Sequence, residues 1–166
     1  MAKIITILPC EKVIVGRDNL PSLIALFEHI NIALSEGQDV VEVPKDTITY
    51  QRWAVFSEWE IDEKEVELKK AEQVLELEYP DGSSAPVRGR IQFEWQVAGI
   101  VRNHQEIYGF PIGQEGWYTI RLWLERDGKR ISNVGERKVR IIHKLDPSHP
   151  QKPIPVLGVS PISDQK

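Results

Sequence analysis

Residues 115–131 constrain the fold more than any other stretch of this chain, because their polarity alternates and then stops at a tight-turn signal. Side chains of a β-strand point alternately to its two faces. One face would hold Tyr118, Ile120, Leu122 and Leu124, and the other Trp117, Thr119, Arg121 and Trp123. Asp127 and Gly128 suit a two-residue hairpin turn, whose central residues both need positive φ. The stretch therefore predicts a central antiparallel strand that begins at Gly116 and is closed by a hairpin.

Strand-like segments recur along the rest of the chain, separated by turn residues. They cover residues 3–8, 13–15, 40–43, 47–61, 75–79, 91–97, 107–112 and 137–143. This order favours an all-β, antiparallel sandwich of about seven to nine strands over alternating βαβ units. Residues 47–61 are apolar on both faces, which places them in the middle of a sheet. Residues 75–79 alternate with glutamate and predict a surface strand, and residues 102–105 a loop or an edge.

Two segments are ambiguous between helix and strand. Residues 20–34 contain apolar residues at helical spacing, yet Phe27 to Ile32 alternate cleanly. We favour a strand there, because the surrounding segments are all β. Residues 62–72 are rich in helix formers, but their apolar residues do not form a helical stripe. A charged loop or one short helical turn is expected for that segment.

The C-terminal residues differ in composition from the rest of the chain. Residues 145–166 contain five prolines and no aromatic residue. Proline fixes φ and lacks a backbone donor, so such a segment cannot form a central strand. The chain is therefore expected to be one β-sandwich domain at residues 1–144, followed by an extended Pro-rich tail at residues 145–166.

Length and cysteine content fit a domain that needs no covalent or metal support. A chain of 166 residues can bury roughly two thirds of its unfolded surface. Cys10 is the only cysteine, so no internal disulfide can form, and a reducing compartment is favoured. The apolar run Ile4–Leu8 is too short for a signal peptide, and no stretch approaches the roughly 20 apolar residues of a membrane span. By elimination we expect a cytoplasmic protein without membrane contact.

The charge distribution argues against nucleic-acid binding and divides the chain. The net charge is −4, which disfavours general binding to nucleic acid. Residues 58–81 contain ten acidic and three basic residues, whereas residues 117–144 contain eight basic and three acidic ones. The simpler interpretation is that these are solvated faces of different strands that lie opposite each other across a sheet. The alternative is a dipolar surface that orients a partner or a second copy.

No residue pattern predicts catalysis, a metal site or a cofactor. His29, His104, His143 and His149 share no ligand spacing, and no cysteine pair is present. Cys10 follows an apolar strand, where a free cysteine usually behaves as a small hydrophobic residue. Glu58 and Glu60 share one strand face near Trp59, but nothing predicts the cleft that a glycosidase needs. We therefore expect a non-catalytic protein without metal or cofactor.

The five tryptophans are the one unusual enrichment. Trp53 and Trp95 fit a core, whereas Trp117 and Trp123 would face outward with Arg121 between them. That face is either covered by the N-terminal strand or the tail, or it is an open binding patch. If it binds a partner, exchanging Arg121 and Trp123 together for alanine should abolish binding without lowering thermal stability. If it is merely packed, the melting temperature should fall.

The order of these signals resembles a family of uncharacterised bacterial proteins, a domain of unknown function with an immunoglobulin-like β-sandwich. The resemblance covers roughly residues 3–143 and rests on turn and core signals. These are the turn at 16–19, the strand with Phe27 and Ile30, Pro80-Asp81-Gly82, and the segments 109–112 and 115–122. The chain departs from the family at residues 62–72 and in its tail. The resemblance implies an immunoglobulin-like fold and assigns no catalytic residue.

The sequence thus predicts a non-catalytic protein-binding or assembly module of a bacterial cytoplasmic or phage-related system. Its partner would be another protein or a second copy, bound at Trp117, Arg121 and Trp123. The alternative is a sandwich that binds carbohydrate or another small ligand through exposed tryptophans, and a carboxylate hydrolase ranks third. Tyr118 should form a tyrosine corner, in which a buried hydroxyl near the start of a late strand bonds to neighbouring backbone.

Overall fold

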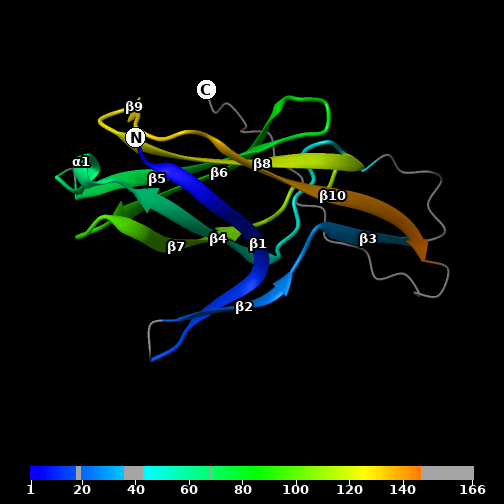
Figure 1. Ribbon diagram of the computed structural model, residues 1–166. Coiled ribbons are helices and arrows are strands. Elements are labelled where there is room, and N and C mark those ends of the chain that lie inside the picture. Colours follow the sequence, from blue (N-terminus) through cyan, green and yellow to red (C-terminus); the bar gives the residue numbers. More distant parts are fainter. Residues whose placement is uncertain (18–19, 36–42, 68, 147–166) are drawn as a thin grey trace, which may run out of the picture.

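Two β-sheets face each other in the computed structural model, which describes residues 1–17, 20–35, 43–67 and 69–146 (Figure 1). The elements are β1 (Lys3–Val15), β2 (Pro21–Leu26), β3 (His29–Ser35), β4 (Arg52–Ile61), α1 (Glu63–Val66), β5 (Lys70–Glu78), β6 (Ser84–Glu94), β7 (Gly99–Tyr108), β8 (Gly116–Arg126), β9 (Lys129–Arg130) and β10 (Gly135–Asp146). The fold is therefore nearly all β, as the sequence predicts.

One sheet, here the β4 sheet, has the strand order β2-β1-β4-β7. The other, the β8 sheet, has the order β3-β10-β8-β5-β6, with β9 paired to β8. All pairs are antiparallel except β3 and β10, which run parallel. The expectation of a purely antiparallel sandwich is wrong at this point. The reason is that β2 continues almost directly into β3, so the chain passes from one sheet to the other and runs beside β10 in the same direction.

The core lies between the sheets and confirms the two faces assigned to β8. Tyr118, Ile120, Leu122 and Leu124 are all fully buried. They share the core with Trp53 and Trp59 of β4. Asp127 and Gly128 have φ of 50° and 72°, so the predicted two-residue turn joins β8 to β9.

The two ambiguous segments are mainly β. Residues 20–34 form strands, as favoured, but as two strands, β2 and β3. Residues 62–72 begin with the expected single helical turn, α1, in which Asp62 and Glu65 form a capping box. Lys70 then starts β5, so the end of this segment is strand rather than loop.

Three strand predictions need correction. Residues 75–79 were expected on the surface, but β5 lies inside the β8 sheet, between β8 and β6. Its outward glutamates can lie there because arginines of the flanking strands pair with them, as Arg90 does with Glu72 at 2.8 Å. The predicted strand 107–112 contributes only its first two residues to β7, and Pro111 forms an isolated bridge with Ile48. The strand predicted at 91–97 starts earlier, at Ser84, and ends at Glu94.

The prediction for residues 40–42 and most of the proposed tail, residues 147–166, lie outside the described part of the chain. Strand β10 itself continues to Asp146. Among the described residues, no helix has the length and apolar character to cross a membrane.

Candidate functional site

The predicted binding residues Trp117, Arg121 and Trp123 share the outer face of β8, as expected from their spacing. Trp117 is 51% exposed, and the Arg140 guanidinium lies 5.8 Å from the centre of its ring. Trp123 is only 7% exposed. Its strand neighbour Val74 is buried beside it. The structure thus places the three residues on one face, and of the two tryptophans only Trp117 is open to solvent.

Charged side chains of the β8 sheet cover the remainder of that face. Arg121 bonds Glu78 at 2.6 Å and Glu136 at 3.0 Å, which joins the acidic and basic parts of the chain across strands β5, β8 and β10. These contacts support the simpler interpretation of the charge pattern. They also show that Arg121 already has two carboxylate partners.

The Trp123 indole is held by a second set of charges. Its Nε1 donates to Glu125 Oε1 at 2.7 Å, and the Arg130 guanidinium lies 5.5 Å from the ring centre. The hydrogen bond from Trp123 and the nearby Arg90 lower the pKa of Glu125. Groups of its own sheet thus contact both the nitrogen and the ring of Trp123.

Tyr118 makes the backbone hydrogen bonds that define a tyrosine corner. Its hydroxyl donates to the Gln114 carbonyl at 3.0 Å and accepts from the Gln114 N–H at 3.2 Å. Burial raises the pKa of the phenol. Gly116, which opens β8, has φ of 134°, a conformation that a side chain would strain. Both residues therefore shape the entry to β8.

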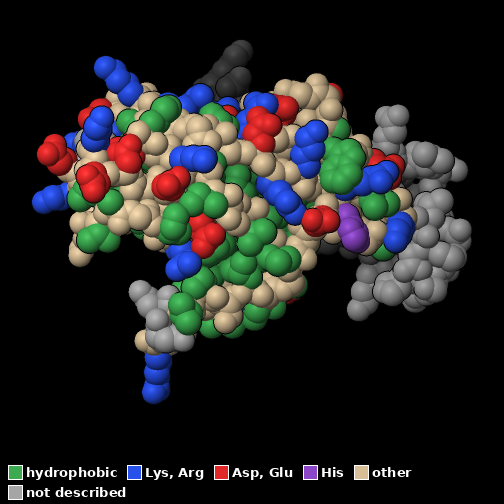
Figure 2. Space-filling model, in the orientation of Figure 1, with side chains coloured by type: hydrophobic (Ala, Val, Ile, Leu, Met, Phe, Trp, Pro, Cys, Tyr) green, Lys and Arg blue, Asp and Glu red, His purple; other side chains and the backbone are tan. Residues whose placement is uncertain are grey.

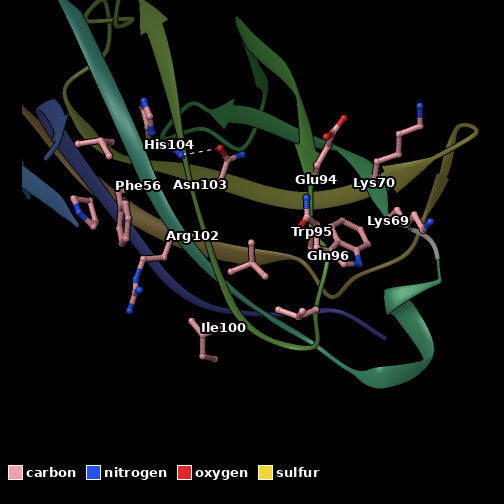
Figure 3. Close-up of a pocket in the computed structure, with 14 residues that line it drawn as sticks. Phe56, Lys69, Lys70, Glu94, Trp95, Gln96, Ile100, Arg102, Asn103 and His104 are labelled. Carbon is pink, nitrogen blue, oxygen red and sulfur yellow. Dashed lines mark hydrogen bonds between the residues drawn. The ribbon is translucent and has the colours of Figure 1, made fainter. Parts of the chain in front are cut away.

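A cleft of about 990 Å³ lies at the β7 edge of the β4 sheet, and we call it the β7 cleft. Five consecutive residues of β7, Ile100 to His104, line it. Successive side chains of a strand point to opposite faces, so a cleft touched by five in a row follows the edge of the strand. Figure 3 shows Phe56 and Arg102 on one side of β7, and Glu94 and Trp95 on the other.

The β1–β2 hairpin forms the wall of the β7 cleft on the outer side of the β4 sheet. The hairpin lies below the two layers in Figure 1. Val13 and Leu23 pack with Phe56 of β4 in a second apolar cluster, separate from the main core. Val15 and Pro21, near the tip, line the cleft. The hairpin is thus packed against the outer side of β4, and the residues near its tip reach the cleft.

The opposite wall is fixed by Trp95, directly after β6. The Trp95 indole donates to the Glu65 carbonyl of α1 at 2.9 Å, and its backbone N–H donates to the Lys69 carbonyl at 2.9 Å. These bonds hold the turn between α1 and β5 against the end of β6. The same turn places Lys69 and Lys70 at the cleft. Lys69 has φ of 58°, in the left-handed region that residues other than glycine rarely adopt.

A buried network of polar side chains lies behind the cleft, centred on Gln73 of β5. The Gln73 Oε1 accepts from Ser57 Oγ at 2.8 Å and from Trp59 Nε1 at 2.9 Å. Its Nε2 donates to Gln105 Oε1 at 3.3 Å. The half-buried amide of Asn103, which lines the cleft, lies 3.5 Å from the same Gln73 oxygen. Buried polar groups are stable only when they are hydrogen-bonded, so this network fixes the position of β7.

Basic groups outnumber acidic ones around the β7 cleft. Lys69, Lys70, Arg102 and His104 line it, against the single carboxylate of Glu94. Arg102 bonds Glu58 at 2.9 Å. Within the described part of the chain, neither Lys69 nor Lys70 has an ion-pair partner. Glu94 lies directly opposite Lys70 in the β5–β6 ladder, so the cleft combines apolar walls with a small excess of positive charge.

These residues could not be selected as a site from the sequence alone. Residues 102–105 were expected to form a loop or an edge, and they belong to the edge strand β7. One signal was present: Ser57 and Gln73 interrupt the inward apolar rows of their strands, which indicates a polar cluster in the core. The lysines could not be connected to this cluster without the turn that Trp95 fixes.

The remaining groups that bear on metal binding or catalysis are the possible metal ligands, Cys10 and the glutamates of β4. No group of three or more His, Cys, Asp or Glu side chains among them could hold a metal ion. Cys10 is fully buried, with its Sγ 3.7 Å from the Ala54 carbonyl, and burial raises the pKa of its thiol. Glu58 and Glu60 lie on the outer side of β4, opposite the face that carries the buried Trp59.

Comparison of the chain with models of protein families finds no match, and neither does comparison with curated proteins.

Proposed function

We propose that this protein is a non-catalytic protein-binding or assembly module that acts through the β1–β2 hairpin and the adjoining β7 edge. The observation that carries the proposal is a group of exposed apolar side chains there. Ile14, Ile24 and Leu26 belong to the hairpin, and each is exposed by more than two fifths. Exposed apolar groups of this kind mark protein interaction sites.

The patch continues across the cleft. Val97, in the turn between β6 and β7, and Ile100, at the start of β7, are also exposed and line the cleft together with Val15. Figure 2 shows hydrophobic side chains gathered over the lower part of the molecule, where β1 and β2 lie, whereas the upper part alternates between basic and acidic groups. The two parts of the surface thus differ in chemical character.

A protein partner has more support than a carbohydrate. A sugar-binding face would need two tryptophan rings side by side, and four of the five tryptophans are buried. Trp117 alone is exposed, with Arg140 beside its ring.

The proposal includes an immunoglobulin-like arrangement of the sandwich. In its support, β1-β4-β7 follows the order of strands A, B and E, and β10-β8-β5-β6 follows G, F, C and C′. The corner at Tyr118 then falls at the start of the F strand, where such domains have it. Cys10, free and buried, suits the reducing cytoplasm, and we propose a bacterial or phage-related system as the setting.

The test is quantitative affinity capture with the full chain as bait, from extracts of cells that produce it. The double variant Ile24→Ser/Leu26→Ser should lose the captured partners, whereas the control Trp117→Ser on the other sheet should keep them. Both variants change exposed residues, so their melting temperatures should stay within a few degrees of the wild type. Equal capture by wild type and hairpin variant would reject the proposal.

A further inference from the structure

We propose that the β7 cleft binds an extended peptide segment of a protein partner, whose acidic and apolar residues alternate and which adds as a strand to the edge of β7. This inference rests on the proposed function and specifies the chemistry of the partner. Three observations carry it: the open edge of β7, the side chains on either side of that edge, and the excess of positive charge in the cleft.

The edge of β7 is available for pairing. Among the described residues β7 has one ladder partner, β4, and it contains no proline. Near its far end β7 touches β6 closely, since a Cβ added to Gly89 would lie 2.2 Å from Gln105 Nε2. Toward Ile100 the cleft separates the two strands. Proteins usually protect such edges, because an open edge accepts a further strand.

The side chains on the two sides of the β7 edge differ, so the two faces of an added strand would meet different neighbours. On the outer side are Arg102 and His104, which lie opposite Glu58 and Phe56 of β4. On the inner side are Val101 and Asn103, with Trp95 across the cleft. Cross-strand neighbours of opposite charge, and apolar neighbours, stabilise a sheet. Acidic residues of the peptide would therefore lie on the side of Arg102, which also bonds Glu58 at 2.9 Å, and apolar residues on the side of the half-buried Val101.

The backbone N–H of His104, beside the free edge, is bonded to a neighbouring side chain that an added strand would replace. The His104 N–H donates to Oδ1 of Asn103 at 2.9 Å, a bond drawn in Figure 3. A carbonyl oxygen of the added strand would take over this N–H. The Asn103 amide would remain beside the Gln73 network.

Lys69 adds an independent argument for acidic ligands. Its left-handed backbone favours glycine, yet a lysine occupies the position and lines the cleft without an ion-pair partner in the described chain. A residue held against its backbone preference indicates a role for its side chain. Lys70 lies next to it, with Glu94 opposite in the β5–β6 ladder, so the peptide would meet a net positive charge at this wall.

A partner chain fits better than a second copy of this protein. The acidic, alternating strand of this chain is β5, and β5 is already paired on both sides. None of the described strands with a free edge supplies an alternating acidic and apolar row. Self-association through β7 is therefore an outcome that the test must detect.

The probe is a fluorescein-labelled eight-residue peptide of alternating glutamate and valine, titrated with the full chain and followed by anisotropy. One control peptide has lysine in place of glutamate, and the other keeps the composition but has proline at two central positions. The acidic peptide should bind several-fold more tightly than either control. Amide exchange should slow at residues 100–104 of β7 when it binds. Equal binding of the proline peptide, or no binding of the acidic one, overturns the proposal.

Two variants of Lys69 separate the effect of its charge from the effect of its backbone conformation. Lys69→Gln should weaken the acidic peptide by about two- to fivefold, the size of an exposed ion pair, and the control Lys138→Gln on β10 should not. Lys69→Gly should weaken binding as much while leaving the melting temperature equal or higher, because glycine suits the positive φ. A fall in stability with unchanged peptide affinity would show that Lys69 is structural and would count against the inference.

Two results distinguish this inference from the proposed function. If Ile24→Ser/Leu26→Ser abolishes partner capture while the acidic peptide fails to bind wild type, the module stands and the added strand is wrong. If the protein sediments as a dimer that Lys69→Gln dissociates, the occupant is a second copy and the inference is overturned.

Discussion

The outer faces of the two sheets differ in how their side chains are satisfied. On the β8 sheet, Arg121 bonds two glutamates and Trp123 is held by Glu125 and Arg130. On the β4 sheet side, the hairpin exposes Ile24 and Leu26, and the adjoining cleft holds lysines without ion-pair partners in the described chain. On the first face, Arg121 and Trp123 find their partners within the sheet. The second face leaves apolar side chains and lysines exposed to solvent.

This difference shows that an unusual sequence pattern can mark a surface whose side chains are already bonded to one another. Two tryptophans around an arginine look like a binding patch, yet most of that patch is used within the sheet. The hairpin residues look like ordinary strand residues, yet they remain exposed. Binding at Trp117, Arg121 and Trp123 stays a prediction, and it would have to displace existing ion pairs.

The largest expected effect tests whether the β8 face is closed. Trp123→Ala should lower the free energy of unfolding by about 3 kcal/mol, because it removes a buried aromatic side chain and leaves a cavity beside Val74. The matched variant Trp117→Ala, at an exposed site on the same strand, should change it by under about 1 kcal/mol. Urea denaturation measures both. Equal losses would mean that the two indoles are equally packed, and the comparison of faces would fail.

The next effect concerns the polar network behind the β7 cleft. Gln73→Leu should lower stability by about 2 kcal/mol, because Trp59 Nε1, Ser57 and Gln105 each lose a buried partner. The control Leu75→Met, two residues along the same inward row, keeps the volume and should cost under about 1.5 kcal/mol. Amide exchange of β7 should quicken in the first variant alone. Unchanged exchange there would show that the network does not position the edge.

Local patterns were enough to predict much of the fold. Alternation identified β8 and its buried face, and the Asp127–Gly128 turn needed only the preference for positive φ. The charged turn at α1 was also expected from the absence of a helical stripe. The parallel pairing of β3 with β10 could not be predicted, because it depends on where the chain crosses between sheets.

The candidate site was less accessible to sequence reasoning for a physical reason. It combines the hairpin tip, the turn before β5 and the edge of β7, and these are brought together by tertiary contacts such as the bonds of Trp95 to Glu65 and Lys69. Likewise, β5 looked like a surface strand because its outward glutamates are charged. Arginines on neighbouring strands neutralise them, which a single segment cannot reveal.

A smaller effect tests the inner face of the strand that carries Trp123. Tyr118→Phe should lower stability by about 1 kcal/mol, because the buried hydroxyl makes two hydrogen bonds to the Gln114 backbone. Thermal or urea unfolding measures the change. Tyr108→Phe is the control, since Tyr108 is 71% exposed and should lose almost nothing. A loss at Tyr118 no larger than at Tyr108 would mean that the corner contributes nothing to stability.

The smallest effect uses pH to test whether the β8 face depends on its own charges. The pKa of Glu125 is lowered in the folded state, first by the hydrogen bond from Trp123 and then by Arg90. Its contribution is therefore complete above the unfolded pKa of about 4.3 and is lost as pH falls through the lower folded pKa. Wild type should lose under about 1 kcal/mol more than Glu125→Gln between neutral pH and pH 3, after discounting for solvent screening. Urea unfolding at the two pH values measures this difference, with Glu63→Gln, at a carboxylate outside the network, as the control variant. If Glu125→Gln loses as much stability in acid as wild type, the charges on this face are incidental and its closure rests on the packing of Trp123 alone.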